Sequence, residues 1–213
     1  MALTFRDSGE KQFAFQILYY PWVQGLDLQT PSFQQHVPTA IKLMQEESFS
    51  SFLGAFLGIP IKNYPDLWQN KHVRLETWEK YKKFFNIDEI PKEGIPHNYK
   101  QVRPEPKAIN KALADLVEDE LTDPYLWPLL ADDLSNLPPV YILVAEYDPI
   151  RDEGIWFANR LKRAGNVVLY DYYPDGFHGM ISFRDSPMKI DTALRAIDNT
   201  KAFIRRILKN TKK

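Results

Sequence analysis

The chain has 213 residues, of which 44% are hydrophobic and 14% aromatic, and its 27 basic and 28 acidic side chains give a net charge of -1. This composition predicts one globular domain with a real core and excludes a disordered chain. The balanced charge excludes binding to nucleic acid or to an anionic membrane through bulk positive charge. The absence of cysteine excludes disulfides, thiolate metal sites and a cysteine nucleophile.

The first strong pattern is a continuous apolar run at residues 13–20, which Pro21 ends. Such a run is typical of a buried strand, so we assign a strand to residues 13–21. No apolar run is long enough to span a bilayer, and the first residues do not resemble a signal peptide. We therefore expect no membrane segment and no export signal in this chain, which leaves its localisation open.

A helical pattern follows at about residues 40–122. Apolar side chains recur at helical spacing up to residue 57, and Gly58 and Pro60 then end the helix. A second amphipathic stretch begins at residue 75, residues 86–107 are predicted as loop, and residues 108–121 as a short helix. The larger apolar side chains here either line an acyl pocket or serve ordinary helix packing; they are Met44, Phe49, Phe52, Phe56 and Trp78.

Residues 138–213 predict strand, helix, strand and helix. The apolar run at 140–147 is a strand. Asp152 is a candidate N-cap of the next helix, and Gly165 stands where a C-terminal cap is expected. A strand then runs from 167 to 173. Ser186 and Pro187 mark a helix start, and an apolar stripe continues to residue 208. This order predicts a parallel sheet with helices packed on it.

Two side chains are candidate catalytic groups. Asp148 ends the strand at 140–147, and His178 lies just beyond the next strand, 30 positions later. An acid and a histidine so placed meet at the carboxyl edge of a parallel sheet. The alternatives are a strand-end turn carboxylate for Asp148 and a surface loop histidine for His178.

Several spaced motifs together resemble the hormone-sensitive-lipase-type α/β-hydrolases, and within them the arylacetamide deacetylase-like esterases. The resemblance covers nearly the whole chain, and its motifs occur in the family's order. They are ILYYP (17–21), LQTPSF (28–33), DPYLWPLL (123–130), LPP (137–139), EYDPIRDEG (146–154) and GFHG (176–179).

The resemblance implies an α/β fold: the C-terminal part of an α/β-hydrolase, with three mainly parallel strands, flanking helices and a helical lid insertion at about 40–122. It implies that Asp148 is the triad acid and His178 the triad base. It further implies a lipophilic ester or amide substrate, with no metal and no cofactor. For a full-length parent it suggests the endoplasmic reticulum membrane.

The chain departs from the family at the nucleophile. It has neither a Gly-x-Ser-x-Gly elbow nor a His-Gly-Gly-Gly oxyanion loop. We therefore expect a truncated hydrolase that retains acid and base and is inactive alone. Ser8 only echoes half an elbow, because no strand precedes it, and is predicted to be a solvated serine. The remaining histidines have no metal-ligand spacing and are assigned to surface or loop positions; they are His36, His72 and His97.

Two other readings remain open. The chain could be a non-catalytic interaction module that associates with another hydrolase chain through the exposed sheet edge of its first strand. A third interpretation is an unrelated three-layer α/β enzyme, which a large separation between Asp148 and His178 would exclude.

Overall fold

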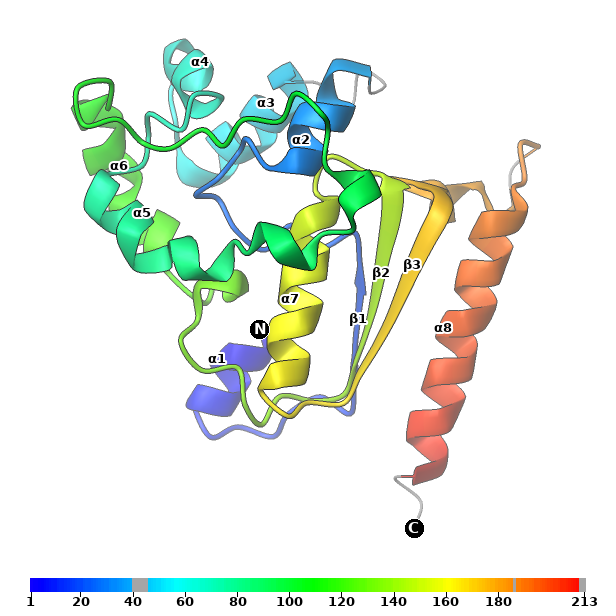
Figure 1. Cartoon of the computed structure of the whole chain (residues 1–213). Coiled ribbons are helices and arrows are strands. Elements are labelled where there is room, and N and C mark those ends of the chain that lie inside the picture. The colour runs from blue at the N-terminus through cyan, green and yellow to red at the C-terminus, as the bar shows by residue number, and fades with distance from the viewer. Residues whose placement is uncertain (40–45, 186, 211–213) are drawn as a thin grey trace. The chain divides into compact units, whose positions relative to one another are not determined.

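The computed structural model describes residues 1–39, 46–185 and 187–210 and contains two compact units (Figure 1). The sheet unit comprises Met1–Trp22 and Asp132–Lys213, and the helical unit comprises Val23–Ala131. All strands of the described residues lie in the sheet unit.

The sheet unit is built on three parallel strands in the order β1-β2-β3. The strand β2 is central, and its first six residues are buried. A parallel pair needs a crossover, and helix α7 supplies the one between β2 and β3. The elements of this unit are α1 (Ala2–Asp7), β1 (Gln16–Tyr19), β2 (Val140–Tyr147), α7 (Arg151–Arg163), β3 (Val168–Phe177), the 3-10 turn η8 (Met180–Phe183) and α8 (Asp191–Asn210).

Helices α7 and α8 cover opposite faces of the sheet (Figure 1). Alternate side chains of a strand point to opposite faces. Val144 faces α7 so closely that a Cβ added at Gly154 would lie 2.6 Å from its methyl group. Tyr141 and Leu143 point the other way and join Phe203 of α8 in one buried cluster. The predicted parallel sheet with packed helices is therefore confirmed.

The strand bounds differ from the predicted ones at residues that reach the site. Strand β1 is shorter than the range 13–21, because Tyr20 leaves the extended conformation with φ at 51°. Strand β3 is longer than predicted and continues through Pro174 to Phe177. The continuation is irregular, with a register shift against β2 between Ala145 and Tyr147.

The start of α7 corrects a prediction. Asp152 is not the N-cap: that position is Ile150, and Asp152 lies in the first helical turn. The reason is the preceding turn, in which the Asp148 carboxylate accepts a hydrogen bond from the Ile150 backbone N–H at 3.0 Å. The carboxylate of Asp152 instead binds the Arg151 side chain at 3.0 Å.

Gly165 ends α7 as predicted. It has φ at 83°, and its N–H donates to the Lys162 carbonyl at 3.0 Å. The N–H of Asn166 donates to Leu161 at 3.1 Å, which completes a Schellman motif. The Asn166 side chain then accepts from the Leu137 N–H at 2.8 Å, so this cap also fixes the approach to β2.

Helix α8 begins later than predicted. Ser186 lies outside the described residues, and Pro187 precedes the helix, which starts at Asp191. The backbone N–H of Ile190 donates to the Phe183 carbonyl at 3.3 Å. This bond turns the chain back to η8, so regular helix starts only afterwards.

The helical unit consists of short helices and 3-10 turns. The helix predicted at 75–81 is confirmed, the one at 108–121 is shifted to begin after the cap Asn110, and the one predicted from 40 is described from Glu46. Whether the unit is a lid stays a prediction. In the described ranges no helix is long and apolar enough to cross a bilayer. The elements are α2 (Pro31–His36), η1 (Val37–Thr39), α3 (Glu46–Leu57), η3 (Ile61–Asn63), α4 (Tyr64–Leu67), α5 (Leu75–Tyr81), η4 (Lys82–Phe84), η5 (Ile87–Glu89), η6 (Lys92–Gly94), α6 (Lys111–Thr122) and η7 (Pro128–Leu130).

Candidate active site

The irregular end of β3 brings the two candidate catalytic side chains level with each other. Ala145 pairs with Tyr173 and Tyr147 pairs with Phe177, so β3 uses four residues where β2 uses two. The residues that follow these last partners are Asp148 and His178. The backbone N–H of His178 donates to the Tyr147 carbonyl at 3.4 Å, which continues the pairing past the bulge.

Asp148 is buried, with 1% of its surface exposed. One carboxylate oxygen, Oδ1, accepts from the Ile150 N–H at 3.0 Å, and the other, Oδ2, lies 3.0 Å from Nδ1 of His178. The Asp148 carbonyl also accepts from the Arg151 N–H at 3.1 Å. Both ends of the carboxylate therefore have fixed partners, and the one directed at the imidazole has little freedom to rotate.

The imidazole of His178 is only partly covered, with 29% of the side chain exposed. A carboxylate accepts hydrogen bonds and donates none, so its contact favours the tautomer that carries the proton on Nδ1. In this tautomer Nε2 keeps a free lone pair. Asp148 thus orients His178 so that the basic nitrogen Nε2 is directed away from the carboxylate.

Two glycines shape the segment that holds His178. A Cβ at Gly176 would lie 2.8 Å from Sδ of Met180 and 2.9 Å from Cβ of Tyr173, so only glycine fits this crossing. Gly179 has φ at 81°, which disfavours other residues. The Gly-x-His-Gly pattern is therefore a backbone requirement of the turn that presents the imidazole.

A charge cluster is formed by residues on both sides of Asp148 in the chain. The guanidinium of Arg151 binds the Glu146 carboxylate at 2.9 Å and the Asp152 carboxylate at 3.0 Å, and the Arg151 and Asp152 side chains are fully buried. The hydroxyl of Tyr172 donates to the other oxygen of Glu146. The cluster joins β2, β3 and the start of α7 across the turn that carries Asp148.

Tyr20 was missed by the sequence analysis and lies beside the candidate pair. Its ring centroid is 5.0 Å from that of His178, and its hydroxyl accepts from the Ile181 N–H at 3.3 Å. Burial raises the pKa of Tyr20 above its ordinary value, and the negative charge of Asp148 adds to this effect. The one sequence signal was a tyrosine at the end of a strand, immediately before Pro21.

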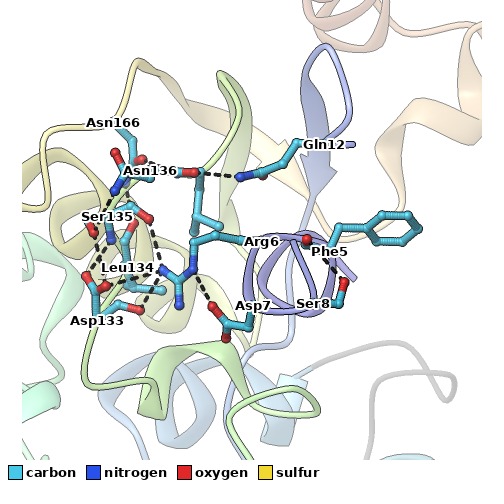
Figure 2. A network of polar contacts seen from close by, with 11 residues as sticks. Phe5, Arg6, Asp7, Ser8, Gln12, Asp133, Leu134, Ser135, Asn136 and Asn166 are labelled. Atoms are coloured by element: carbon cyan, nitrogen blue, oxygen red, sulfur yellow. Dashed lines mark hydrogen bonds and ion pairs between the residues drawn. The ribbon is translucent and has the colours of Figure 1, made fainter. Parts of the chain in front are cut away.

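Figure 2 shows Ser8 beside Phe5 and Arg6, in the network that joins the end of α1 to the segment before β2. Ser8 is exposed and follows α1, and its hydroxyl donates to the Phe5 carbonyl at 3.3 Å. Arg6 of the same helix donates to the Ser135 carbonyl at 2.9 Å, before β2 begins. Asp148 follows the far end of β2, and eight strand residues span about 25 Å. Ser8 is therefore not placed to act with His178.

The remaining candidates belong to the helical unit. Phe49 and Trp78 are buried, whereas Phe52 and Phe56 are 58% and 59% exposed; Met44 lies outside the described residues. Phe49 packs against Phe33 and Trp78 against Phe85, and the acyl-pocket role stays a prediction. His97 is exposed as predicted, and His72 is buried outside the helices; the surface or loop position predicted for His36 is wrong, because it is buried in α2. Across the described ranges no group of three or more His, Asp or Glu side chains could hold a metal ion.

Comparison with known proteins gives a consistent result. A model of the α/β hydrolase fold matches residues 91–182. Arylacetamide deacetylase-like 3 from Homo sapiens is 34% identical over 168 residues, covering 78% of this chain and 40% of that protein. Neutral cholesterol ester hydrolase 1 from Rattus norvegicus is 32% identical over 203 residues, covering 92% of this chain and 48% of that protein.

A solved esterase from Pyrobaculum calidifontis shares the fold, with a TM-score of 0.60 at 22% identity, over 97% of this chain and 47% of that one. The chain thus spans about half the length of the curated relatives it matches. The parallel sheet, the order of its elements and these matches agree. The chain has the α/β-hydrolase fold and is similar to the arylacetamide deacetylase-like proteins and neutral cholesterol ester hydrolase 1.

Proposed function

We propose that this chain supplies the acid and the base of a serine carboxylic-ester or amide hydrolase. Asp148 is the acid and His178 the base. The observation that carries the proposal is the 3.0 Å contact between a buried carboxylate and a partly exposed imidazole. A substrate with a lipophilic acyl or alcohol part is suggested by relatives named for cholesterol esters and arylacetamides.

In the proposed mechanism His178 acts twice. Its Nε2 takes the proton of a serine hydroxyl as the oxygen attacks the ester carbonyl, and then returns the proton to the leaving alcohol or amine. Water repeats the sequence on the acyl-enzyme. Asp148 holds the proton-bearing Nδ1, so that the imidazole keeps its tautomer, and stabilises the imidazolium as it forms.

The serine and the oxyanion donors have no counterpart in this sequence, which contains neither a Gly-x-Ser-x-Gly nor a His-Gly-Gly-Gly motif. Those two groups supply most of the rate of such enzymes. The chain alone is therefore proposed to be a truncated hydrolase without turnover. The full activity belongs to an assembly or a longer chain that provides the elbow.

The first test is a fluorophosphonate labelling assay on the purified chain, with turnover of a nitrophenyl ester measured in parallel. We expect no labelled serine and no turnover from folded protein. A labelled serine whose reaction is lost in His178→Ala would contradict the proposed inactivity, because it would reveal a nucleophile within these 213 residues.

The roles of the pair are tested in a fusion that places a relative's elbow-bearing segment ahead of this chain. We expect ester turnover, and a loss of about 10⁴-fold or more in kcat for His178→Ala and for Asp148→Ala. The exposed His97 provides the matched control, and His97→Ala should leave kcat unchanged. A His178→Ala fusion that kept its turnover would rule out the proposed base.

A second candidate function is an interaction module that pairs with another hydrolase chain. The observation that favours it is the position of β1, which is hydrogen-bonded to β2 on one side and forms one edge of the described sheet. Its four side chains are only partly buried, and Phe13 just before it is 40% exposed. Such an edge is a template for strand addition.

Light scattering on the chain with and without a related hydrolase separates this function from the first. A stable complex that Ile17→Pro abolishes would support the module, because proline removes a backbone donor from the strand and distorts its edge. A folded chain that stays monomeric with every such partner would exclude it.

A further inference from the structure

Tyr20 holds an unusual backbone conformation at the point where β1 ends. Its φ of 51° lies in the left-handed region, which the Cβ of a residue other than glycine disfavours. Its N–H donates to the Leu143 carbonyl at 3.1 Å, so the β1–β2 pairing continues into this residue. A disfavoured conformation that its surroundings enforce directs a side chain where a regular strand would not.

The side chain so directed reaches two parts of the candidate site. Its ring lies against the imidazole of His178, with centroids 5.0 Å apart and ring planes at 41°. Its hydroxyl accepts from the backbone N–H of Ile181 at 3.3 Å, three residues beyond the histidine. One residue immediately after the first strand therefore contacts both the imidazole and the loop that carries it.

The contact with Tyr20 restricts a rotation of the imidazole that the bond to Asp148 leaves possible. The bond between Asp148 and Nδ1 at 3.0 Å fixes one point of the imidazole, but a ring held at one point can still pivot about that bond. A second ring against its side limits this motion. The raised pKa of Tyr20, caused first by its burial, keeps the phenol neutral, so it adds no charge beside Asp148.

We propose that Tyr20 is a positioning residue for His178, which acts by packing its ring against the imidazole and by holding the following loop through Ile181. The inference rests on the proposed function, in which His178 is the base. It assigns the orientation of the base to a residue 158 positions earlier in the chain, immediately after the first strand of the described sheet.

The test reads the tautomer of His178 directly, without any need for turnover. The full chain is uniformly labelled with 15N, so that histidine side chains and backbone amides are both observed, and is studied well above the ordinary histidine pKa of about 6.5. Two-bond 15N–1H correlations then report which ring nitrogen carries the proton. In the unchanged chain we expect Nδ1 to carry it.

Three variants separate the contacts. Tyr20→Asn removes the ring and keeps a residue that tolerates positive φ, so the share of molecules protonated on Nδ1 should fall severalfold. Tyr20→Phe keeps the ring and should keep the tautomer of His178. The Ile181 amide should exchange its hydrogen with solvent about fivefold faster, because it loses the hydrogen bond to the Tyr20 hydroxyl. The control Tyr19→Phe loses a hydroxyl bonded to Thr200 at 2.8 Å and should change neither signal.

The outcomes distinguish the two proposals. Asp148→Ala should release the tautomer; if it does not, the proposed acid–base pair itself fails. If Asp148→Ala releases the tautomer and Tyr20→Asn does not, only the role of Tyr20 is overturned. In each variant the amide signals of Val144 and Ala145, in buried β2, show that the sheet is still folded. If Tyr20→Asn unfolds the chain, the test becomes the exchange rate of the Ile181 amide in Tyr20→Phe compared with Tyr19→Phe. Equal rates in these two variants would then overturn the role of Tyr20.

Discussion

The sheet unit and the helical unit position their residues by different means. In the sheet unit a central strand with six consecutive buried residues fixes the register, and buried charges gather where β2 passes into α7. In the helical unit the helices are short, and buried polar side chains tie one loop to another. Asn70, with φ at 50°, accepts from the Leu28 N–H at 3.0 Å and donates to Asp27 and to the Val102 carbonyl.

The difference shows what each unit is suited to. Strand pairing sets the positions of many residues at once, so an acid and a base that follow two neighbouring strands meet reliably. A side-chain hydrogen bond between two loops fixes their distance at one place only, and a single substitution can remove it without affecting the others. We therefore expect the sheet unit to lose most stability when its buried charges or its close packing are changed. The helical unit should lose stability when individual polar side chains are replaced.

The largest expected effect is the loss of the buried guanidinium in the sheet unit. Arg151→Met leaves the Glu146 and Asp152 carboxylates without their shared cation in a site where Arg151 and Asp152 are fully buried. We expect the free energy of unfolding to fall by about 3–5 kcal/mol. Urea denaturation of the full chain, followed by circular dichroism, measures it. The control Arg184→Met breaks an exposed pair with Asp185 and should change little; equal effects of the two would refute the comparison.

The helical unit should respond to acid through one histidine. The ring of His72 is fully buried; Nε2 lies 2.8 Å from the Gly25 carbonyl, and Nδ1 has no hydrogen-bond partner among the described residues. Burial lowers the pKa of His72 to about 4, and the bond to Gly25 opposes this only in part. The unfolded chain therefore binds a proton first as the pH falls. Stability is full above pH 6.5 and should decline by about 3 kcal/mol between pH 6.5 and about 4.

Unfolding curves taken at stepped pH test this, with amide exchange to locate the loss. His72→Gln keeps a donor for Gly25 without a group that titrates, and should flatten the decline. The exposed His97 is the control, since His97→Gln should leave the decline unchanged. Amides of α6, in the helical unit, should lose protection before those of β2; the reverse order would contradict the assignment to His72.

Replacing one helix glycine in each unit compares how closely the two units are packed, with smaller expected changes in stability. At Gly154 an added Cβ would meet the Val144 methyl at 2.6 Å, and this β-branched side chain on the central strand has little room to turn. At Gly54 it would meet the hydroxyl and the adjoining ring carbons of Tyr64, which form the far end of a side chain that can swing aside. We expect Gly154→Ala to cost about 1–3 kcal/mol, and Gly54→Ala to be near neutral because alanine favours the helix by about 0.5–1 kcal/mol. Thermal unfolding of both variants side by side measures the difference, and equal costs would show that the two helices pack alike.

The smallest effect concerns a helix cap. Asn110 accepts from the Leu113 N–H at 3.1 Å and donates to the Asp66 carboxylate at 2.8 Å, whereas α7 in the sheet unit begins without a side-chain cap. Asn110→Ala should lower the free energy of unfolding by about 1 kcal/mol. Asn110→Asp keeps the cap acceptor and loses the donor to Asp66. If both variants cost the same, the bond to Asp66 and not the cap accounts for the stability.

The candidate pair was predictable from the sequence because its elements are strongly patterned. The apolar run before Asp148 and the strand before His178 each end at a polar residue, and one helix of suitable length separates them. The N-cap at Asp152 was wrong for a local reason, since the Asp148 carboxylate takes the role of starting the turn. The sequence pattern does not indicate whether Asp148 or Asp152 accepts the backbone hydrogen bond that begins the turn.

By itself the sequence determined the α/β class, the parallel order of strand and helix in residues 138–213, and the two residues proposed as acid and base. These follow from apolar periodicity and from turn residues, which act over short stretches of chain. Only the tertiary structure decided the two-residue bulge in β3, the contact of Tyr20 with His178 and the cluster around Arg151. Each of these joins segments that pair across the sheet, and the energy of such a contact depends on register and burial, which no local pattern encodes.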